Sequence, residues 1–419
     1  MAMGRDRFGN RFAPGLPYAR GEIVRSTEDD FRKLQRAQAV IARRGPDAVF
    51  NFTGLERALP LASAELALAD DELAPALYGE RFRALALEHL GGTAGRHDAM
   101  LFNRLTAATF ATHLALAQPG DTVIGVSPTY THPTGIRSAA QAGARFVEAG
   151  GVDGLEAALA REPRVSLVVL TRLAVTYDLL PLDDVRAVVR LAHAAGARVY
   201  ADDAGGARVG PAIFGQPRTL ELGVDVGATG LDKYGTVGPR LGLLAGDAAL
   251  VARIRARAYE FGLEARPMLY PAAVRSLAGY TPERVRVLVE TTRAVGQALR
   301  GVFGPRVHVT PVTAQLRADD LLALAMERAG LTVAPVAPIE ATAAVAMLLL
   351  EDYGVITVHF AGMPPGTSSL LVKFVPPETL ERFGGAEALA KAIDSSVDRL
   401  AALLREPAAL RALLLGDNA

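Results

Sequence analysis

The sequence predicts an α/β protein, with a mostly parallel central sheet in a large domain and a smaller α+β domain after it. Between about residues 73 and 262, short continuous apolar segments alternate with helical segments of about ten or more residues. This alternation is typical of buried parallel strands that are connected by helices. Beyond about residue 262 the strand candidates follow one another more closely. We therefore expect an N-terminal arm and helix (1–50), a large domain (51–261) and a small C-terminal domain (262–419).

The individual elements follow from the same pattern. Before the large sheet, an amphipathic helix is expected at 28–44. In the large domain, helices are expected at 73–90, 105–117, 135–142, 154–160 and 181–195. Strands are expected between them at 122–126, 145–148, 165–170, 197–201 and 224–229. In the C-terminal part, a long helical stretch is expected at 271–303 and a final helix at 378–404. Strand candidates lie between them at 307–312, 345–350, 355–360 and 369–375.

Composition excludes several classes of protein. The 45 basic and 45 acidic residues leave no net charge, which does not favour nucleic-acid binding. The chain has no cysteine, so disulfides, thiolate catalysis and zinc–thiolate sites are excluded, and we expect no metal site. The N-terminal segment has no apolar core of a signal peptide, and the apolar runs are too short to span a bilayer. We expect a soluble, cytoplasmic protein without a membrane partner.

Lysine is rare in this chain, and one lysine is isolated. Of the 45 basic residues only four are lysine, namely Lys33, Lys233, Lys373 and Lys391. Lysine, unlike arginine, can lose its proton near neutral pH and attack a carbonyl group as a free amine. Lys233 is therefore a candidate for a Schiff-base lysine. The alternative is a lysine that persists by chance on a loop.

A carboxylate stands at the matching place on the preceding strand. Asp202 follows the expected strand 197–201, and the carboxyl ends of strands in an open α/β sheet are where ligands bind. In an enzyme that depends on pyridoxal 5′-phosphate (PLP), such an aspartate pairs with the pyridinium nitrogen of the cofactor. Ala204 is small enough to lie against the ring. The alternative for Asp202 is a turn or helix cap.

Three further features fit the same site. Thr106 and Ala107 begin a helix whose free amides would hold a phosphate, although an ordinary helix start gives the same pattern. His132 follows the strand 122–126, where it would stack on a pyridine ring or lie on a surface loop. Gly238 belongs to a glycine-rich loop after Lys233, where the backbone turns sharply or approaches a ligand.

The segment around the lysine resembles a known family. Asp232-Lys233 followed by Gly238-Pro239-x-x-Gly242 is similar to the lysine segment of bacterial selenocysteine synthase, the L-seryl-tRNA selenium transferase. It is closer still to short archaeal-type homologues of that enzyme, a PLP-dependent family of largely unassigned activity. The resemblance covers roughly residues 75–280. It implies the fold-type-I, aspartate-aminotransferase-like architecture and an active site at the interface of a homodimer or higher homo-oligomer.

The resemblance also implies roles for individual residues. Lys233 would form the internal aldimine, Asp202 would bind the ring nitrogen, and Thr106 and Ala107 would bind the phosphate. The bacterial enzyme grips tRNA with an N-terminal domain, whereas here about 50 residues precede the core. We therefore expect no nucleic-acid substrate, and in particular no tRNA.

On the substrate side, Arg81 and Arg266 resemble positions where this family holds an anionic group. The planar guanidinium suits that role. Arg208 and Arg240 flank the expected cofactor and are lesser candidates.

The resemblance favours a reaction on a small amino compound that bears an anionic group. Lys233 would remove the α-proton as a general base, and β-elimination or β-replacement would follow. A fold-type-I transaminase or an aldolase-like lyase is an alternative, because one fold hosts many chemistries. A protein that binds PLP without turnover is a second alternative.

Overall fold

The computed structural model describes residues 4–358 and 368–416, and it divides the chain into two compact units. One unit is Glu56–Arg286, and the other joins Met1–Leu55 to Val287–Ala419. The sequence was expected to divide after residues 50 and 261 instead. The second division lies after residue 286, within the continuous helix α11 (Pro282–Phe303). No glycine or proline stands at this point of the sequence to mark a boundary.

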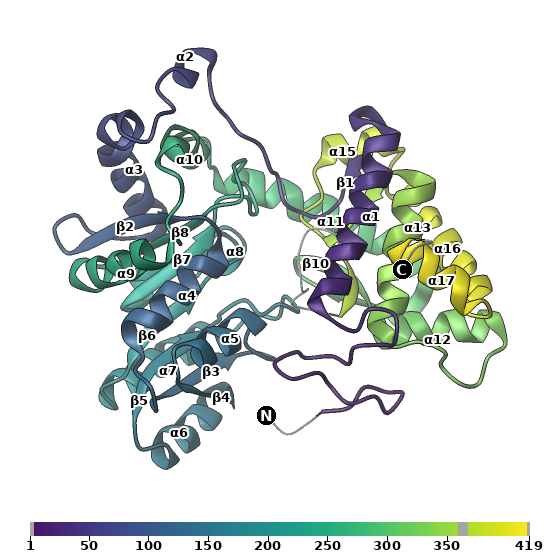
Figure 1. Cartoon of the computed structure of the whole chain (residues 1–419), viewed down its shortest axis with the longest axis horizontal. Helices are drawn as coiled ribbons and strands as arrows, with labels where there is room; N and C mark the ends of the chain where they lie inside the picture. Colours follow the sequence, from purple (N-terminus) through teal and green to yellow (C-terminus); the bar gives the residue numbers. More distant parts are fainter. Residues whose placement is uncertain (1–3, 359–367, 417–419) are drawn as a thin grey trace. The chain divides into compact units, whose positions relative to one another are not determined.

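A seven-stranded sheet forms the centre of the unit Glu56–Arg286, with strand order β2-β8-β7-β6-β5-β3-β4 (Figure 1). β8 is antiparallel to both of its neighbours, and the remaining strands run parallel to one another. The fold is therefore the mostly parallel α/β class that the sequence predicts. The strands are β2 (His97–Phe102), β3 (Thr122–Ser127), β4 (Arg145–Gly150), β5 (Val165–Leu170), β6 (Arg198–Asp202), β7 (Val226–Gly230) and β8 (Gly242–Asp247).

Helices cover both faces of this sheet, so its strands are buried on both sides and read as continuous apolar runs. In β5, Val168 and Leu170 face one core while Leu167 and Val169 face the other. The helices of this unit are α2 (Ser63–Leu66), α3 (Leu73–Leu90), α4 (Leu105–Leu116), α5 (Pro133–Gln141), α6 (Gly151–Arg161), α7 (Leu182–Ala194), α8 (Gly206–Phe214), α9 (Ala248–Phe261) and α10 (Tyr270–Ala278).

The other unit has a three-stranded antiparallel sheet of order β12-β10-β9 and a short parallel pair, β1 with β11. Its strands are β1 (Phe50–Asn51), β9 (Val307–Thr310), β10 (Thr313–Arg317), β11 (Val355–Ile356) and β12 (Ser369–Lys373). Its helices, besides most of α11, are α1 (Thr27–Arg44), α12 (Ala318–Ala329), α13 (Pro338–Tyr353), α15 (Pro377–Phe383), α16 (Ala386–Leu403) and α17 (Pro407–Leu415).

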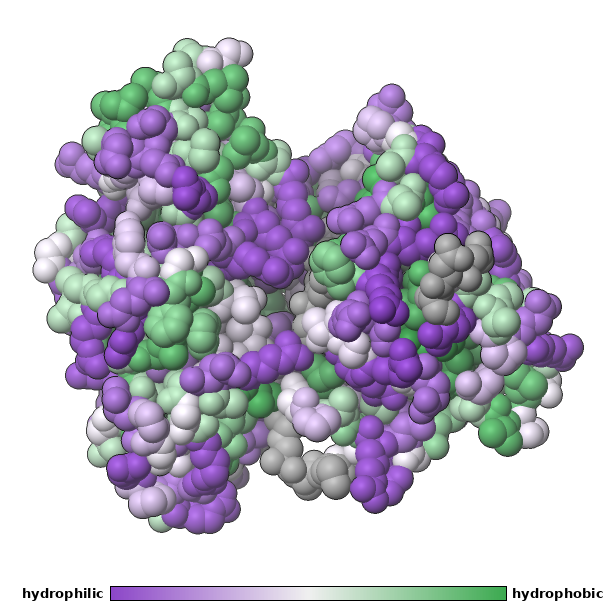
Figure 2. All heavy atoms as spheres, viewed as in Figure 1, coloured by the Kyte–Doolittle hydropathy of each residue, from purple (hydrophilic) through white to green (hydrophobic). Residues whose placement is uncertain are grey.

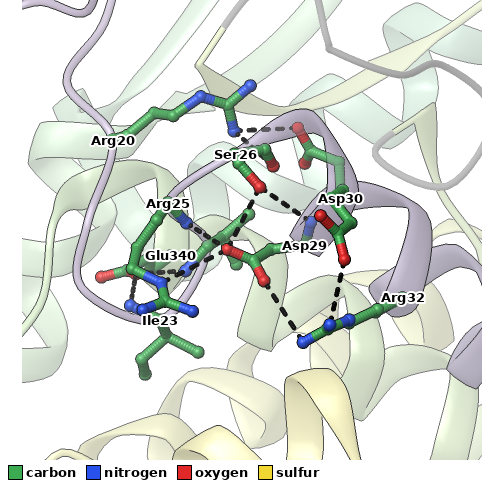
Figure 3. Close-up of polar contacts among 10 residues, drawn as sticks. Arg20, Ile23, Arg25, Ser26, Asp29, Asp30, Arg32 and Glu340 are labelled. Carbon is green, nitrogen blue, oxygen red and sulfur yellow. Dashed lines mark hydrogen bonds and ion pairs between the residues drawn. The ribbon is translucent and has the colours of Figure 1, made fainter. Parts of the chain in front are cut away.

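The N-terminal segment, expected as a separate arm, packs with the C-terminal part of the chain. The buried carboxylate of Glu340 accepts hydrogen bonds from the amides of Ile23 (2.6 Å) and Val24 (2.8 Å) (Figure 3). Gly21 approaches so closely that an added Cβ would lie 1.8 Å from this carboxylate. The long-range contacts of one glutamate therefore help to make 1–55 part of the C-terminal unit, which local sequence patterns do not reveal.

Several expected elements were wrong in type or length. Residues 345–350, expected as a strand, lie within α13, which is buried on every side along this stretch. Such a helix has no polar face, so a short stretch of it cannot be told from a buried strand. The helix expected at 271–303 is two helices, α10 and α11, and that at 378–404 is α15 and α16. Of the expected strand 355–360, the structure has β11 only, and residues 359–360 lie outside the described part.

Over residues 4–358 and 368–416, we find no helix with the length and apolar character that crossing a bilayer would require.

Candidate active site

The carboxyl ends of the parallel strands bring the predicted site residues to one edge of the large sheet. Asp202 ends β6, and Lys233 follows shortly after the end of β7. The segment between β3 and α5 carries His132, and the segment between β2 and α4 carries Arg104. Register confirms a common edge, because Phe102 of β2 and Gly230 of β7 both pair with Gly242 of β8.

The side chain of Lys233 is half-buried and has no hydrogen bond or ion pair with any residue in the described part of the chain. Gly230 makes room for it, since a Cβ there would lie 3.1 Å from the lysine Cε. Burial lowers the pKa of the amine, against the opposing effect of Asp232 and Asp202. The Lys233 amine is therefore more easily uncharged in the protein than a lysine amine is in water.

Asp202 is a buried carboxylate with an unused acceptor. Its exposed fraction is 6%, and its Oδ1 is buried without a hydrogen-bond partner among the described residues. Burial raises the pKa of Asp202 to about 6, and Lys233 acts in the opposite direction. A buried carboxylate oxygen without a partner is costly unless a ligand donates to it.

The start of α4 is free to bind an anion. Arg104 is the residue before its first turn, and no side chain caps this helix. Thr106 is exposed and Ala107 half-buried. The amide of Ala107 already donates to Arg104 O at 3.0 Å, so the first-turn amides without a partner among the described residues are those of Leu105 and Thr106. Gly242 lies directly against this helix start, where an added Cβ would be 2.9 Å from the amide nitrogen of Leu105. The loop that follows Lys233 and the expected phosphate helix are therefore neighbours.

His132 and Ala204 occupy the places expected of them along the same edge. His132 caps α5, with its Nδ1 accepting from the amide of Thr134 at 3.1 Å. Burial, followed by the charges of Lys233 and Arg137, lowers the pKa of His132 to about 4, so the ring is neutral at physiological pH. A neutral imidazole near Lys233 can lie against an aromatic ring. Ala204 lies two positions after Asp202 and is half-buried.

A group of arginines near the lysine was not predicted as a group from the sequence. We call Arg57, Arg104 and Arg240 the arginine cluster. Arg57 Nε lies 2.9 Å from Asp232 Oδ2. Arg240 has no hydrogen bond or ion pair to a described residue, and its pKa is lowered to about 10 by desolvation and then by Arg104 and Arg57. The charged groups that act on Arg240 are two arginines and one carboxylate, Asp232, so positive charge is in excess around it. Arg57 gives no local signal, because it lies in the irregular segment between β1 and α2.

The remaining predicted residues lie in different surroundings. Arg208 is fully buried and donates to Thr229 Oγ1 at 3.0 Å, while its Nε and Nη2 find no partner in the described part of the chain. Arg81 is exposed on α3, and Arg266 is exposed and ion-paired with Asp71. Contact of Arg81 or Arg266 with substrate stays a prediction.

Gly238 is explained by packing. Its amide donates to Glu56 O, its carbonyl accepts from the amide of Ala58, and an added Cβ would lie 2.4 Å from Ser276 Oγ. The glycine therefore lets segment 56–58 run beside the lysine loop, and contact with a cofactor stays a prediction. In the described ranges, no group of three or more His, Asp or Glu side chains is arranged to hold a metal ion.

Comparison with known proteins identifies the family. No protein-family model matches the chain. The chain is 31% identical over 396 residues to a UPF0425 pyridoxal phosphate-dependent protein of Methanothermobacter thermautotrophicus, covering 93% of this chain and 98% of that protein. This chain belongs to the UPF0425 family. A second UPF0425 pyridoxal phosphate-dependent protein, of Methanosphaera stadtmanae, is 28% identical over 78% of this chain and 82% of its own length.

Solved structures show the fold of this UPF0425 protein. Serine palmitoyltransferase of Sphingomonas wittichii superposes with a TM-score of 0.58 at 19% identity, over 84% of this chain and 87% of that one. A SepCysS–SepCysE N-terminal domain complex gives a TM-score of 0.57 at 14% identity, over 84% of this chain and 95% of that one. The fold is fold type I, as the sequence resemblance implied, and the UPF0425 relatives are named pyridoxal phosphate-dependent proteins.

The residues at the sheet edge fit PLP. The unpartnered Oδ1 of Asp202 matches a protonated ring nitrogen, and the amine of Lys233, which has no partner among the described residues, matches the aldehyde. The uncapped start of α4 matches the phosphate. Three chemically different groups of one cofactor thus each meet a suitable group on this edge.

Proposed function

We propose that this UPF0425 protein is a PLP-dependent transferase or lyase that removes the α-proton of a small amino compound bearing an anionic group, with β-elimination or β-replacement to follow. The observation that carries this proposal is the position of Lys233, a half-buried amine without a partner among the described residues, close to the arginine cluster. An amine that acts as a base beside surplus positive charge suits an amino compound with a negative group.

PLP, when bound, supplies an electron-withdrawing ring that stabilises negative charge at the α-carbon of the substrate. Lys233 Nζ accepts the α-proton, because burial favours its uncharged form. Asp202 holds the proton on the ring nitrogen through the oxygen that otherwise lacks a donor. His132, which burial keeps neutral, would lie against the ring without competing for that proton.

The arginine cluster binds the anionic group of the substrate. Arg240 lies on the loop after Lys233, is exposed, and makes no ion pair or hydrogen bond with a described residue. Arg57 shares its charge with Asp232, and Arg104 lies at the helix start where the phosphate of PLP is expected. A guanidinium binds a carboxylate or phosphate through parallel N–H donors, so Arg240 fixes both the position and the orientation of the substrate.

The likeness of the lysine segment to selenocysteine synthase supports β-replacement or β-elimination over other PLP reactions. The two solved structures named above share the fold alone and do not discriminate among reactions. The zero net charge of the chain supports a small-molecule substrate over tRNA.

We also propose that a second copy of the chain completes the active protein. Leu59, Leu66, Leu73 and Leu77 are exposed by 48–61% of their surface. Leu73 and Leu77 share one face of α3, and Figure 2 shows hydrophobic side chains gathered where Figure 1 places α2 and α3. Exposed apolar surface of this kind is typical of a protein interface.

A panel of amino acids with and without β-leaving groups, incubated with the PLP-loaded protein in deuterated water, tests the reaction. We expect exchange of the α-proton, with release of ammonia and a 2-oxo acid from substrates whose β-substituent is an anion such as phosphate. Transfer of the amino group to an added 2-oxo acid would instead identify a transaminase. Absence of α-proton exchange across the whole panel would favour a protein that binds PLP without turnover.

A further inference from the structure

A second aspartate stands directly after Asp202 and is paired with a fully buried arginine. Arg172 and Asp203 are each about 1% exposed. Two parallel hydrogen bonds join them, from Arg172 Nε to Asp203 Oδ1 (2.9 Å) and from Arg172 Nη2 to Asp203 Oδ2 (2.7 Å). This is the fork geometry that gives an arginine–carboxylate pair its strength.

The backbone places the two aspartates on opposite faces of the sheet edge. Asp203 continues β6 by one residue, because its amide donates to Ala228 O of β7 at 2.9 Å. Side chains alternate along a strand, so Asp202 points to one face and Asp203 to the other. The pair of Asp203 with Arg172 thus holds the end of β6 from the face opposite the expected cofactor.

Further bonds tie this pair to the segment that follows α8. Arg172 Nη1 donates to Pro217 O at 2.7 Å, and Thr219 Oγ1 donates to Asp203 Oδ2 at 2.7 Å. Two glycines of α8 leave space for the arginine: an added Cβ at Gly206 or Gly210 would lie 2.8 or 2.9 Å from atoms of Arg172. The fold around α8 is therefore shaped to admit this one side chain.

The Arg172–Asp203 pair also affects how easily Asp202 ionises. Two adjacent carboxylates that are both buried repel each other, and each makes ionisation of the other harder. Asp203 contributes in this direction to the raised pKa of Asp202. Arg172 cancels the charge of Asp203 at hydrogen-bond distance and so limits that contribution.

We propose that Arg172 and Asp203 form a positioning pair that keeps the neighbouring Asp202 carboxylate ionised and directed at the ring nitrogen of PLP. This inference rests on the role proposed for Asp202 above. Arg172 is a positioning residue, because its hydrogen bonds go to Asp203 and Pro217 O and it would act on Asp202 through Asp203. Two other titratable groups interact electrostatically with Asp202: Lys233, from the loop after β7, and Tyr200, from its own strand.

The test is the titration of Asp202 in full-length, cofactor-free protein, measured by carboxyl ¹³C NMR with Asp202→Asn to assign the signal. Arg172→Met removes the positive charge that faces the two adjacent aspartates, so we expect the midpoint of Asp202 to rise by about one pH unit. Asp203→Asn leaves Arg172 as an uncompensated cation, so we expect the midpoint to fall. The double variant Arg172→Met/Asp203→Asn should return it close to the wild-type value.

Opposite shifts of the Asp202 midpoint in the two single variants would indicate a charge effect. Loss of packing would instead shift the midpoint in the same direction in both variants. The PLP affinity gives a second reading: its loss at acidic pH should begin at higher pH in Arg172→Met and at lower pH in Asp203→Asn. If Arg172→Met does not fold, Asp203→Asn and the double variant still decide the question. Arg198→Met, which breaks a more exposed pair with Asp225, is the matched control and should leave the midpoint unchanged.

The outcomes separate this inference from the proposed function. If Asp202→Asn leaves PLP affinity and the visible spectrum unchanged, the role of Asp202 itself is wrong. If Asp202→Asn weakens PLP binding, but the two single variants shift the midpoint equally or not at all, the positioning pair is wrong and the proposed function stands.

Discussion

Arg57 lies against Asp232, with 2.9 Å between its Nε and the carboxylate Oδ2, although 175 residues separate the two in the chain. The segment 56–58 reaches this place because it bonds to Gly238 in the lysine loop. The residue directly before Lys233 is thus neutralised by a side chain from before the first strand of the large sheet. This contact links the charge of the candidate Schiff-base lysine to the ordering of a distant segment.

Replacing Arg57 with methionine should destabilise the protein and raise the pKa of Lys233. Asp232 would be left buried and unpaired, at a cost of about 2–3 kcal/mol, below that of a fully buried pair because Arg57 is 31% exposed. The uncompensated carboxylate would favour the charged amine, so activity that needs the free amine should require higher pH. Denaturant unfolding and a pH–rate profile measure the two effects. Arg275→Met, which breaks a more exposed pair with Glu65, should leave the profile unshifted.

Lys233→Ala should abolish covalent attachment of PLP. Wild-type protein with PLP should absorb visible light, and borohydride should bleach the band and fix the cofactor to the peptide that contains Lys233. Lys233→Arg should fail in the same way, because a guanidinium stays protonated. Lys391→Ala, at an exposed position on α16, is the control and should behave as wild type. A cofactor adduct that persists in Lys233→Ala would overturn the assignment.

Asp202→Asn should stabilise the cofactor-free protein while it weakens PLP binding. The pKa of Asp202 is raised in the folded state to about 6, so its ionised form destabilises the fold above that pH. Asparagine removes this penalty, on the order of 2–3 kcal/mol at pH 8 and close to zero near pH 4. PLP affinity should fall by roughly tenfold or more, since a charge-assisted hydrogen bond is lost. Asp183→Asn, at an exposed site, should change neither quantity. Equal stability of wild type and Asp202→Asn at pH 8 would contradict the prediction.

Glu148→Gln should make stability less dependent on pH. Glu148 of β4 accepts from the amide (3.0 Å) and the hydroxyl (2.9 Å) of Thr131, and burial raises the pKa of this carboxyl to about 7. Because the folded pKa lies above the ordinary value, the ionised form destabilises the fold, and the penalty grows as pH rises toward and through 7. An amide oxygen in place of the carboxylate can still accept from Thr131, so we expect a gain of about 1–2 kcal/mol at pH 8, and close to none near pH 4. Unfolding curves at both values test this, with the exposed Glu156→Gln as control.

Charged residues on α2 and α3 should separate a homodimer. Leu66→Glu with Leu77→Glu places charge on the exposed apolar surface, and buried charge at an interface costs far more than charge in water. Light scattering should give twice the chain mass for wild type and the chain mass for the double variant. Substitution of the exposed Val333, in the other unit, by glutamate is the control. A wild-type protein that is monomeric at micromolar concentration would contradict the proposed homodimer.

Local patterns predicted much of the large sheet, and they suggested the residues of the candidate site. The helix expected at 73–90 is α3, because a run of helix-forming residues ends at Gly91, which adopts φ +76° as a helix-terminating glycine. β2 and β8 were not expected. β8 is rich in glycine and alanine, which have weak strand propensity, and its antiparallel partner β2 lies far away in the sequence. Lys233 was singled out because lysine is rare in this chain, and Asp202 because a carboxylate directly follows a strand of the predicted sheet.

The sequence by itself determined the fold class, the cofactor chemistry and the two residues proposed to serve it, because strand periodicity and the chemistry of lysine and aspartate are local properties. Tertiary structure alone decided the electrostatic surroundings of those residues. Arg57 reaches Asp232, Arg172 reaches Asp203, and Arg240 lies near other cations without a partner among the described residues. Which cation meets which carboxylate depends on how distant segments pack, and in a chain with 45 basic and 45 acidic residues no local pattern selects the partners.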